Sequence, residues 1–143
     1  MKKSAYDSLQ ENVRKLKMPE IETWQNKYPD KDYEIQLEIP EFTCICPKTN
    51  LPDFAVINLW YAPDKWCAEL KSFKYYINSY RNIGIFHEHA VNKVLEDFVK
   101  ATKPRRARAE GIFNARGGIK TTVRAEHRIE KRKAKNVKLK RKV

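Results

Sequence analysis

The sequence predicts an α+β fold in which an antiparallel four-stranded sheet carries two helices on one face. Three observations lead to this prediction. Residues 33–39 alternate apolar and polar side chains with a period of two, as in a strand with one solvated face. Apolar residues recur at spacings of three and four over 70–80 and 91–98, as in helices that bury one side. The elements follow the order strand, strand, helix, helix, strand, strand.

The first two strands flank a short loop. Pro40 interrupts the first strand, so its continuation over 42–45 is expected to be kinked or to lie at a sheet edge. Residues 54–61 are β-branched and aromatic, which predicts the second strand. The loop has a length that suits an antiparallel pair, and this pairing would place Cys46 and Asp53 at the same end of the sheet.

The second pair of strands follows the two helices. Residues 82–86 contain a glycine and suit a turn between the helices, and Pro104 ends the helical region. We expect the last two strands over 105–113 and 118–124. Two adjacent glycines lie between them and permit the positive φ angles of a tight turn.

Length and charge indicate one domain with a basic end. The 143 residues can bury a sizeable core. We expect a polar leader over 1–32 with a short helix around 8–17, a folded domain over 33–127, and a basic tail over 128–143. The net charge of +12 arises late, because residues 102–143 hold 16 Lys or Arg against 3 Asp or Glu. Such a tail either attracts RNA or another polyanion, or only keeps the protein in solution.

Cysteine usage and hydropathy indicate a cytoplasmic protein. The three cysteines, Cys44, Cys46 and Cys67, are odd in number and follow no disulfide-framework spacing. The first residues are polar rather than the apolar core of a signal sequence. No apolar run approaches the roughly 20 residues of a membrane helix.

Cys46 and Asp53 are the first candidates for chemistry. Pro47 follows Cys46, which would end the strand and place the thiol at the rim of the sheet. A thiol becomes a strong nucleophile as the thiolate, and the neighbouring Lys48 could favour that form. Asp53 could act as proton donor or acceptor. The structural alternatives are a buried inert cysteine and a carboxylate that caps a loop.

The segment His87-Glu88-His89 invites a metal hypothesis with Cys44 and Cys46 as further ligands. Residues two apart on a helix point to different sides, unlike the i, i+4 pair of helical zinc sites, so we expect no metal. Glu88 is better suited to accept hydrogen bonds from two adjacent N–H groups, such as the edge of a guanine-like base. Its structural alternative is a carboxylate that interacts with the helix dipole.

No glycine-rich phosphate motif is present, since the four glycines form neither GxGxxG nor a Walker pattern. Lys71, Lys74 and Arg116 are cations beside hydroxyl groups and glycines, which suits phosphate binding. As isolated charges they are equally explained as solvated surface residues.

Four motifs together resemble those of the NADPH-dependent 7-cyano-7-deazaguanine reductases, and the resemblance covers residues 32–123. They are a Cys-Pro-Lys-Thr segment with a later Pro-Asp, a Glu-Leu-Lys-Ser-Phe-Lys-Tyr-Tyr segment, an Arg-Asn pair before Phe-His-Glu, and an Arg-Gly-Gly turn. In this chain they lie at Cys46–Asp53, Glu69–Tyr76, Arg81–Glu88 and Arg116–Gly118. The lysine-rich end of the chain has no counterpart in the family.

The resemblance implies a tunnelling-fold (T-fold) subunit that assembles through its sheets into a ring, expected as a pair of pentamers. Active sites in this fold lie at subunit interfaces. The implied enzyme reduces the nitrile of 7-cyano-7-deazaguanine to an aminomethyl group with NADPH, in the synthesis of queuosine for tRNA.

The resemblance also implies roles for single residues. Cys46 would attack the nitrile carbon to form a thioimide, Asp53 would supply the proton and His87 would assist its transfer. Glu88 would hold the deazaguanine base. The residues implied to bind NADPH are Glu69, Leu70, Lys71, Ser72, Lys74, Arg116 and Gly117.

Two other functions are open at this point. Reductase-like amidinotransferases keep the Cys and the Asp but act on cyano-deazaguanine within tRNA, which would suit a basic tail. They lack the intact NADPH motif that this chain has, and this favours the reductase. A non-enzymatic RNA-binding protein would use the basic C-terminal third, but it leaves the Cys46–Asp53 and Glu69–Tyr76 segments unexplained.

Overall fold

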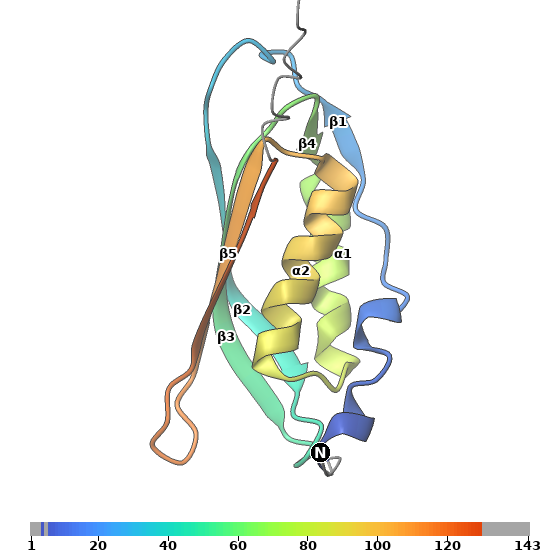
Figure 1. Cartoon of the computed structure of the whole chain (residues 1–143), viewed down its shortest axis with the longest axis vertical. Helices are drawn as coiled ribbons and strands as arrows, with labels where there is room; N and C mark the ends of the chain where they lie inside the picture. Colours follow the sequence, from blue (N-terminus) through green and yellow to red (C-terminus); the bar gives the residue numbers. More distant parts are fainter. Residues whose placement is uncertain (1–3, 5, 130–143) are drawn as a thin grey trace, which may run out of the picture.

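The computed structural model describes Ser4 and residues 6–129. Within them a four-stranded antiparallel sheet, in the order β2-β3-β5-β6, is covered on one face by two helices (Figure 1). This is the predicted α+β arrangement. The strands and helices are β2 Ile35–Ile45, β3 Pro52–Ala62, β5 Arg106–Phe113, β6 Thr122–Arg128, α1 Leu70–Ser79 and α2 His87–Thr102.

A small second sheet was not predicted from the sequence. Strand β1, Thr23–Gln25, pairs antiparallel with β4, Trp66–Ala68, beside the start of α1 (Figure 1). Strands of three residues show too few alternations to be recognised in a sequence. The pairing joins the N-terminal segment to the connection between β3 and α1.

The expected leader lies alongside the helices (Figure 1). Ile21 is buried in the core, and Val13 and Met18 pack against it. The helix expected around 8–17 is wrong: the segment forms two 3-10 turns, Asp7–Leu9 and Val13–Lys15. So short a segment makes too few hydrogen bonds to offset helix nucleation without strong packing. The expected domain limits at residues 32 and 127 stay predictions, and most of the basic tail lies outside the described residues.

Strand β2 is an edge strand, and its register with β3 shifts between Ile39 and Phe42. Both features were expected, because Pro40 has no N–H to donate to a sheet ladder. The strand expected over 118–124 begins later than predicted. Gly117 and Gly118 have φ angles of 56° and 79° and form the turn itself, so β6 begins only at Thr122 and runs to Arg128.

Local chemistry explains where helix α1 begins and where helix α2 ends. Glu69 accepts hydrogen bonds from the N–H groups of the first turn of α1. Helix α2 ends at Thr102, because Lys103 adopts a left-handed φ of 47° and Pro104 follows it. Neither helix in the described part of the chain has the length and apolarity needed to cross a membrane.

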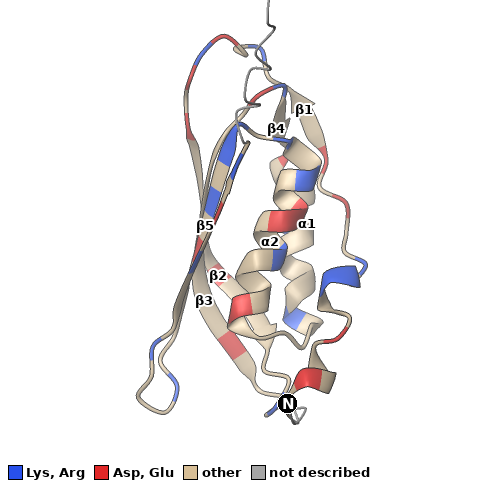
Figure 2. Cartoon of the chain, viewed as in Figure 1, with Lys and Arg blue, Asp and Glu red and all other residues tan. Residues whose placement is uncertain are grey.

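The core lies between the helices and one face of the sheet. Rings from the two layers meet at their edges, as with Tyr61 of β3 and Phe98 of α2, whose centroids are 4.8 Å apart. The opposite face of the sheet carries charged residues, and Figure 2 shows the Lys and Arg bands on β5. There the guanidinium of Arg108 lies 3.9 Å from the ring centroid of Trp60.

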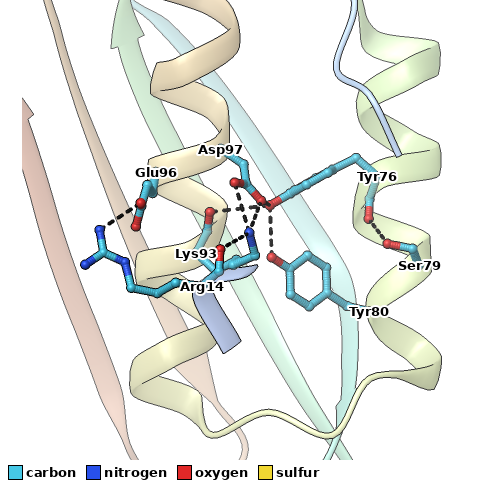
Figure 3. A network of polar contacts seen from close by, with 7 residues as sticks. All are labelled: Arg14, Tyr76, Ser79, Tyr80, Lys93, Glu96 and Asp97. Carbon is cyan, nitrogen blue, oxygen red and sulfur yellow. Dashed lines mark hydrogen bonds and ion pairs between the residues drawn. The ribbon is translucent and has the colours of Figure 1, made fainter. Parts of the chain in front are cut away.

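A buried polar network joins the two helices (Figure 3). The Tyr76 hydroxyl donates to Asp97 over 2.6 Å and contacts the Tyr80 hydroxyl at 2.9 Å. Lys93, whose side chain is 7% exposed, forms an ion pair with Asp97 at 3.0 Å. Its ammonium also donates to the backbone oxygen of Arg14, so the network ties the N-terminal segment to α2.

Candidate functional site

The loop between β2 and β3 holds Cys46 in a closed turn. The Cys46 N–H donates to the oxygen of Leu51, and the Asn50 N–H donates to the oxygen of Cys46, both over 2.9 Å. Asn50 adopts a positive φ of 58°, which Asn tolerates better than most residues. The strand register Ile45↔Pro52 and Cys44↔Asp53 then brings the thiol and the carboxylate to one end of the sheet, as predicted.

Cys46 is buried yet acidic for a thiol. Burial acts to raise its pKa, but hydrogen bonds from the Thr49 hydroxyl, from the N–H groups of Thr49 and Lys48, and from Arg116 outweigh it. Together they lower the pKa from 9.0 to about 7. The Lys48 ammonium is not one of these donors; it lies 5.0 Å from the ring centroid of Tyr6. A large fraction of Cys46 is therefore the nucleophilic thiolate at neutral pH.

Cys44, two residues before Cys46 and near the end of β2, provides an internal contrast. Its side chain is fully buried and donates a weak hydrogen bond to the oxygen of Ile85. Burial and the nearby Asp53 carboxylate raise its pKa to about 12. Cys44 is thus an inert core thiol.

Asp53 has a charged or ionisable partner on each carboxylate oxygen. Its Oδ2 lies 3.0 Å from Nε2 of His87, and its Oδ1 accepts from Nη1 of Arg116 over 2.6 Å. The Asp53 side chain is 3% exposed, whereas that of Arg116 is 48% exposed. The carboxylate is therefore fixed between a buried imidazole and a guanidinium that reaches solvent.

His87 is the first residue of α2 and is held by stacking. Its ring lies parallel to that of Phe113, with 3.8 Å between centroids and 10° between planes. The next two residues face elsewhere, as their spacing predicts: Glu88 is exposed, and His89 Nδ1 contacts Gln10 Oε1 at 2.7 Å. Among the described residues no group of three or more His, Cys, Asp or Glu side chains is arranged to hold a metal ion.

The Glu69–Tyr76 segment divides into capping, core and exposed residues. Both carboxylate oxygens of Glu69 accept from the first turn of α1, at 2.8 Å from the Lys71 N–H and 2.7 Å from the Ser72 N–H. These two bonds lower the pKa of Glu69. Phe73 and Tyr76 belong to the core. The side chains of Leu70, Lys71 and Lys74 remain exposed.

A groove of about 400 Å³ runs between the exposed side of α1 and the free edge of β2. Leu70 and Lys74 line it from the helix, and Arg81 adds a second cation. The β2 side adds two carboxylates, Glu38 and Glu41, so the cations are confined to the helix side, where they could meet the phosphate groups of a ligand whose flat rings lie on the apolar surface. This groove is therefore the candidate site for a dinucleotide cofactor.

One end of this groove, at the start of α1, lies far from Cys46 within a subunit. The Ala68 N–H donates to the Tyr61 hydroxyl, which places the start of α1 beside one end of β3. Asp53 lies at the other end, eight residues away, and a strand rises about 3.3 Å per residue. The start of α1 is therefore roughly 25 Å from Asp53 along the strand.

Sequence reasoning missed two contributors to the site and placed a third differently. Thr49 lies within the Cys-Pro-Lys-Thr motif, where a hydroxyl three residues from the thiol was the available signal. Phe113 ends β5, and nothing in the sequence relates it to His87. Arg116 was predicted to bind a cofactor, whereas in the subunit its guanidinium contacts Asp53.

Comparisons with known proteins agree with the motifs. The model of the QueF-like protein family matches residues 52–132. The NADPH-dependent 7-cyano-7-deazaguanine reductase of Halorhodospira halophila is 57% identical over 107 residues, covering 75% of this chain and 91% of that protein. The enzyme of the same name from Elusimicrobium minutum is 52% identical over 111 residues, covering 78% and 83%.

Among solved structures, the chain is similar to the archaeosine synthase QueF-Like in its apo form. The TM-score is 0.62 at 23% identity, and the match covers 67% of this chain and 94% of that one. At this identity the likeness shows the fold, and it supports the T-fold that the family resemblance implies.

Proposed function

The chain belongs to the QueF-like family of NADPH-dependent 7-cyano-7-deazaguanine reductases, and we propose that Cys46, Asp53, His87 and Arg116 form its nitrile-reducing site. The reaction converts the nitrile of 7-cyano-7-deazaguanine into an aminomethyl group, as a step towards queuosine in tRNA. One observation carries the assignment of the site. A thiol with a pKa of about 7 lies beside a buried carboxylate that is paired with a histidine.

The chemistry begins at sulfur. The Cys46 thiolate forms a bond to the nitrile carbon, and the nitrile nitrogen takes a proton, which gives a thioimide. That proton is held between Asp53 Oδ2 and His87 Nε2, which lie 3.0 Å apart. When the carbon–sulfur bond breaks, Cys46 leaves as the thiolate, which its hydrogen-bond donors stabilise.

Two NADPH molecules, bound in turn, would supply one hydride each for every nitrile. We propose that the groove beside α1 holds it, with Lys74 from the groove lining and the exposed Lys71 beside it on its phosphates. Leu70 offers apolar surface there, while Glu69 and Ser72 fix the first turn of the helix. Arg116 and Gly117 approach the cofactor from the hairpin between β5 and β6.

The substrate base is proposed to bind Glu88. This residue lies in the first turn of α2, directly after His87, and its side chain is exposed. Two carboxylate oxygens can accept from two adjacent N–H groups of the deazaguanine. A base bound there would hold its nitrile close to the Asp53–His87 pair.

The distance within one subunit supports an assembled enzyme. The start of α1 lies roughly 25 Å from Asp53, so a cofactor held by the first turn of α1 would serve the Cys46 of a second copy rather than that of its own subunit. We therefore propose a homo-oligomer with active sites between subunits, built as a pair of pentamers.

The cytoplasm is the proposed location. All three cysteines are free thiols in the structure, which suits a reducing compartment. The basic C-terminal residues are proposed to contact RNA, and those from 130 onward lie outside the described part of the chain.

The test is nicotinamide absorbance after purified protein is mixed with NADPH and 7-cyano-7-deazaguanine. The proposal predicts oxidation of two NADPH per nitrile, abolished in Cys46→Ala. The matched control is Cys44→Ala, which removes the inert thiol and should keep the activity. If NADPH is not oxidised but Cys46 gains a covalent adduct, the assignment moves to an amidinotransferase that acts on tRNA.

A further inference from the structure

Arg116 is held rigidly at the entrance to the site by its hairpin. Its N–H donates to the oxygen of Ile119 over 2.9 Å, and the Ile119 N–H returns the bond over 3.0 Å. The two residues between them are Gly117 and Gly118, both with positive φ. This is the geometry of a two-residue hairpin turn, in which glycine adopts the required φ without strain. The hairpin therefore fixes the position of the Arg116 backbone.

The Arg116 guanidinium reaches two groups of the site. Its Nη1 donates to Asp53 Oδ1 over 2.6 Å. It also donates to the Cys46 sulfur, and this bond is the main cause that raises the pKa of Arg116. A guanidinium carries five N–H donors in one plane, so one side chain can serve a thiolate and a carboxylate together. Its half-exposed edge remains available to a phosphate of NADPH.

We propose that Arg116 is a positioning residue that, together with the Thr49 and Lys48 donors, holds Cys46 as the thiolate and orients the Asp53 carboxyl group before any ligand binds. The value of this role for nitrile reduction rests on the proposed function. The charge state of Cys46 itself can be measured in the protein without substrate or cofactor. The positioning role differs from the role that the Arg-Gly-Gly motif predicts, which is contact with the cofactor.

The other ionisable groups around Cys46 do not supply a positive charge in this way. Asp53 on β3 is an anion and opposes a second negative charge nearby. Cys44 on β2 has its pKa raised to about 12 and stays neutral. The Lys48 ammonium lies over the Tyr6 ring, and His87 on α2 is engaged with Asp53. Among the described residues, Arg116 is the side-chain cation that contacts the sulfur.

The test is the pH dependence of Cys46 alkylation by iodoacetamide in the full chain, without NADPH or nitrile. Peptide mass spectrometry assigns the label to Cys46. We expect a midpoint near pH 7 in the wild type. In Arg116→Met the midpoint should rise, so the alkylation rate at pH 6 should fall severalfold.

Two further variants make the result specific. Arg124→Met makes the same change on β6, where Arg124 pairs with Glu110 at 2.7 Å, and it should leave the midpoint unchanged. Arg116→Lys keeps a positive charge but has no planar fork, so its midpoint should lie between those of wild type and Arg116→Met. If Arg116→Met does not fold, the midpoint of Arg116→Lys tests the proposal in its place.

An Arg116→Met protein that folds, as judged by circular dichroism, and keeps the wild-type midpoint would overturn the proposal. So would a midpoint in Arg116→Lys equal to that of the wild type when the Met variant cannot be measured. Since the assay uses no substrate, its outcome is independent of whether the chain reduces a nitrile. Failure here would leave the proposed function standing, and loss of NADPH oxidation would leave this result standing.

Discussion

Two polar clusters are buried in this chain, and they differ in what burial does to them. The helix network of Tyr76, Tyr80, Lys93 and Asp97 lies between α1 and α2 (Figure 3). The site cluster of Cys46, Asp53, His87 and Arg116 lies at one end of the sheet. Both contain an ion pair, a hydrogen-bonded acid and a side chain that is nearly fully buried.

The two clusters differ in the pKa values of their hydroxyl and thiol groups. In the helix network, burial and the neighbouring Asp97 raise the pKa of Tyr76 and of Tyr80, so both hydroxyls stay protonated. In the site cluster, hydrogen-bond donors and a half-exposed guanidinium outweigh burial and lower the pKa of Cys46. Burial of polar groups therefore does not by itself mark a reactive site. What marks it is an arrangement of donors that favours the charged form.

The largest expected effect separates activity from stability in the site cluster. Asp53→Asn keeps the shape and an acceptor for Arg116 but cannot carry the proton, so NADPH oxidation should fall about 10²–10⁴-fold. The free energy of unfolding, measured in urea, should change little. A stability loss that accounts for the lost activity would remove the distinction between the two clusters.

The second-largest effect is a loss of stability without a loss of activity, and it concerns the helix network. Asp97→Ala leaves the buried Lys93 ammonium without its partner, which should cost about 3–5 kcal/mol of the free energy of unfolding. Activity per folded molecule should remain. The control is Glu96→Ala, which removes a neighbouring carboxylate whose ion pair with Arg14 is exposed, and this change should matter far less. Equal losses in the two variants would contradict a structural network.

The smallest expected effect concerns one hydroxyl of the same network. Tyr80→Phe removes a hydrogen bond, but the Tyr76 hydroxyl keeps Asp97 as its acceptor at 2.6 Å. The free energy of unfolding should therefore fall by only about 1 kcal/mol. Urea denaturation beside Asp97→Ala measures it. A loss as large as that of Asp97→Ala would mean that the Tyr80 hydroxyl, rather than the Lys93–Asp97 pair, holds the network together.

Much of the fold could be predicted because its signals are local. The alternation over 33–39 and the helical spacings over 70–80 and 91–98 correspond to β2, α1 and α2. Pro40 predicted an edge strand, and β2 is one. The β1–β4 pair could not be predicted in the same way, since three-residue strands show no period and their pairing depends on tertiary contacts.

The site could be predicted as a set of motifs but not as an arrangement. The antiparallel loop alone was enough to bring Cys46 and Asp53 to one end of the sheet. The contact of Arg116 with Asp53 depends on how far the β5–β6 hairpin extends, and the prediction began β6 four residues early. The stacking of His87 on Phe113 joins two elements that the sequence does not relate.

The most direct test of the account is the intact mass of the full chain after it is mixed with 7-cyano-7-deazaguanine in the absence of NADPH. The account predicts a gain of one nitrile molecule per chain at Cys46, faster as the pH rises through about 7 and absent in Cys46→Ala. No mass gain at any pH, or a gain that persists in Cys46→Ala, would contradict the assignment of Cys46 as the nucleophile.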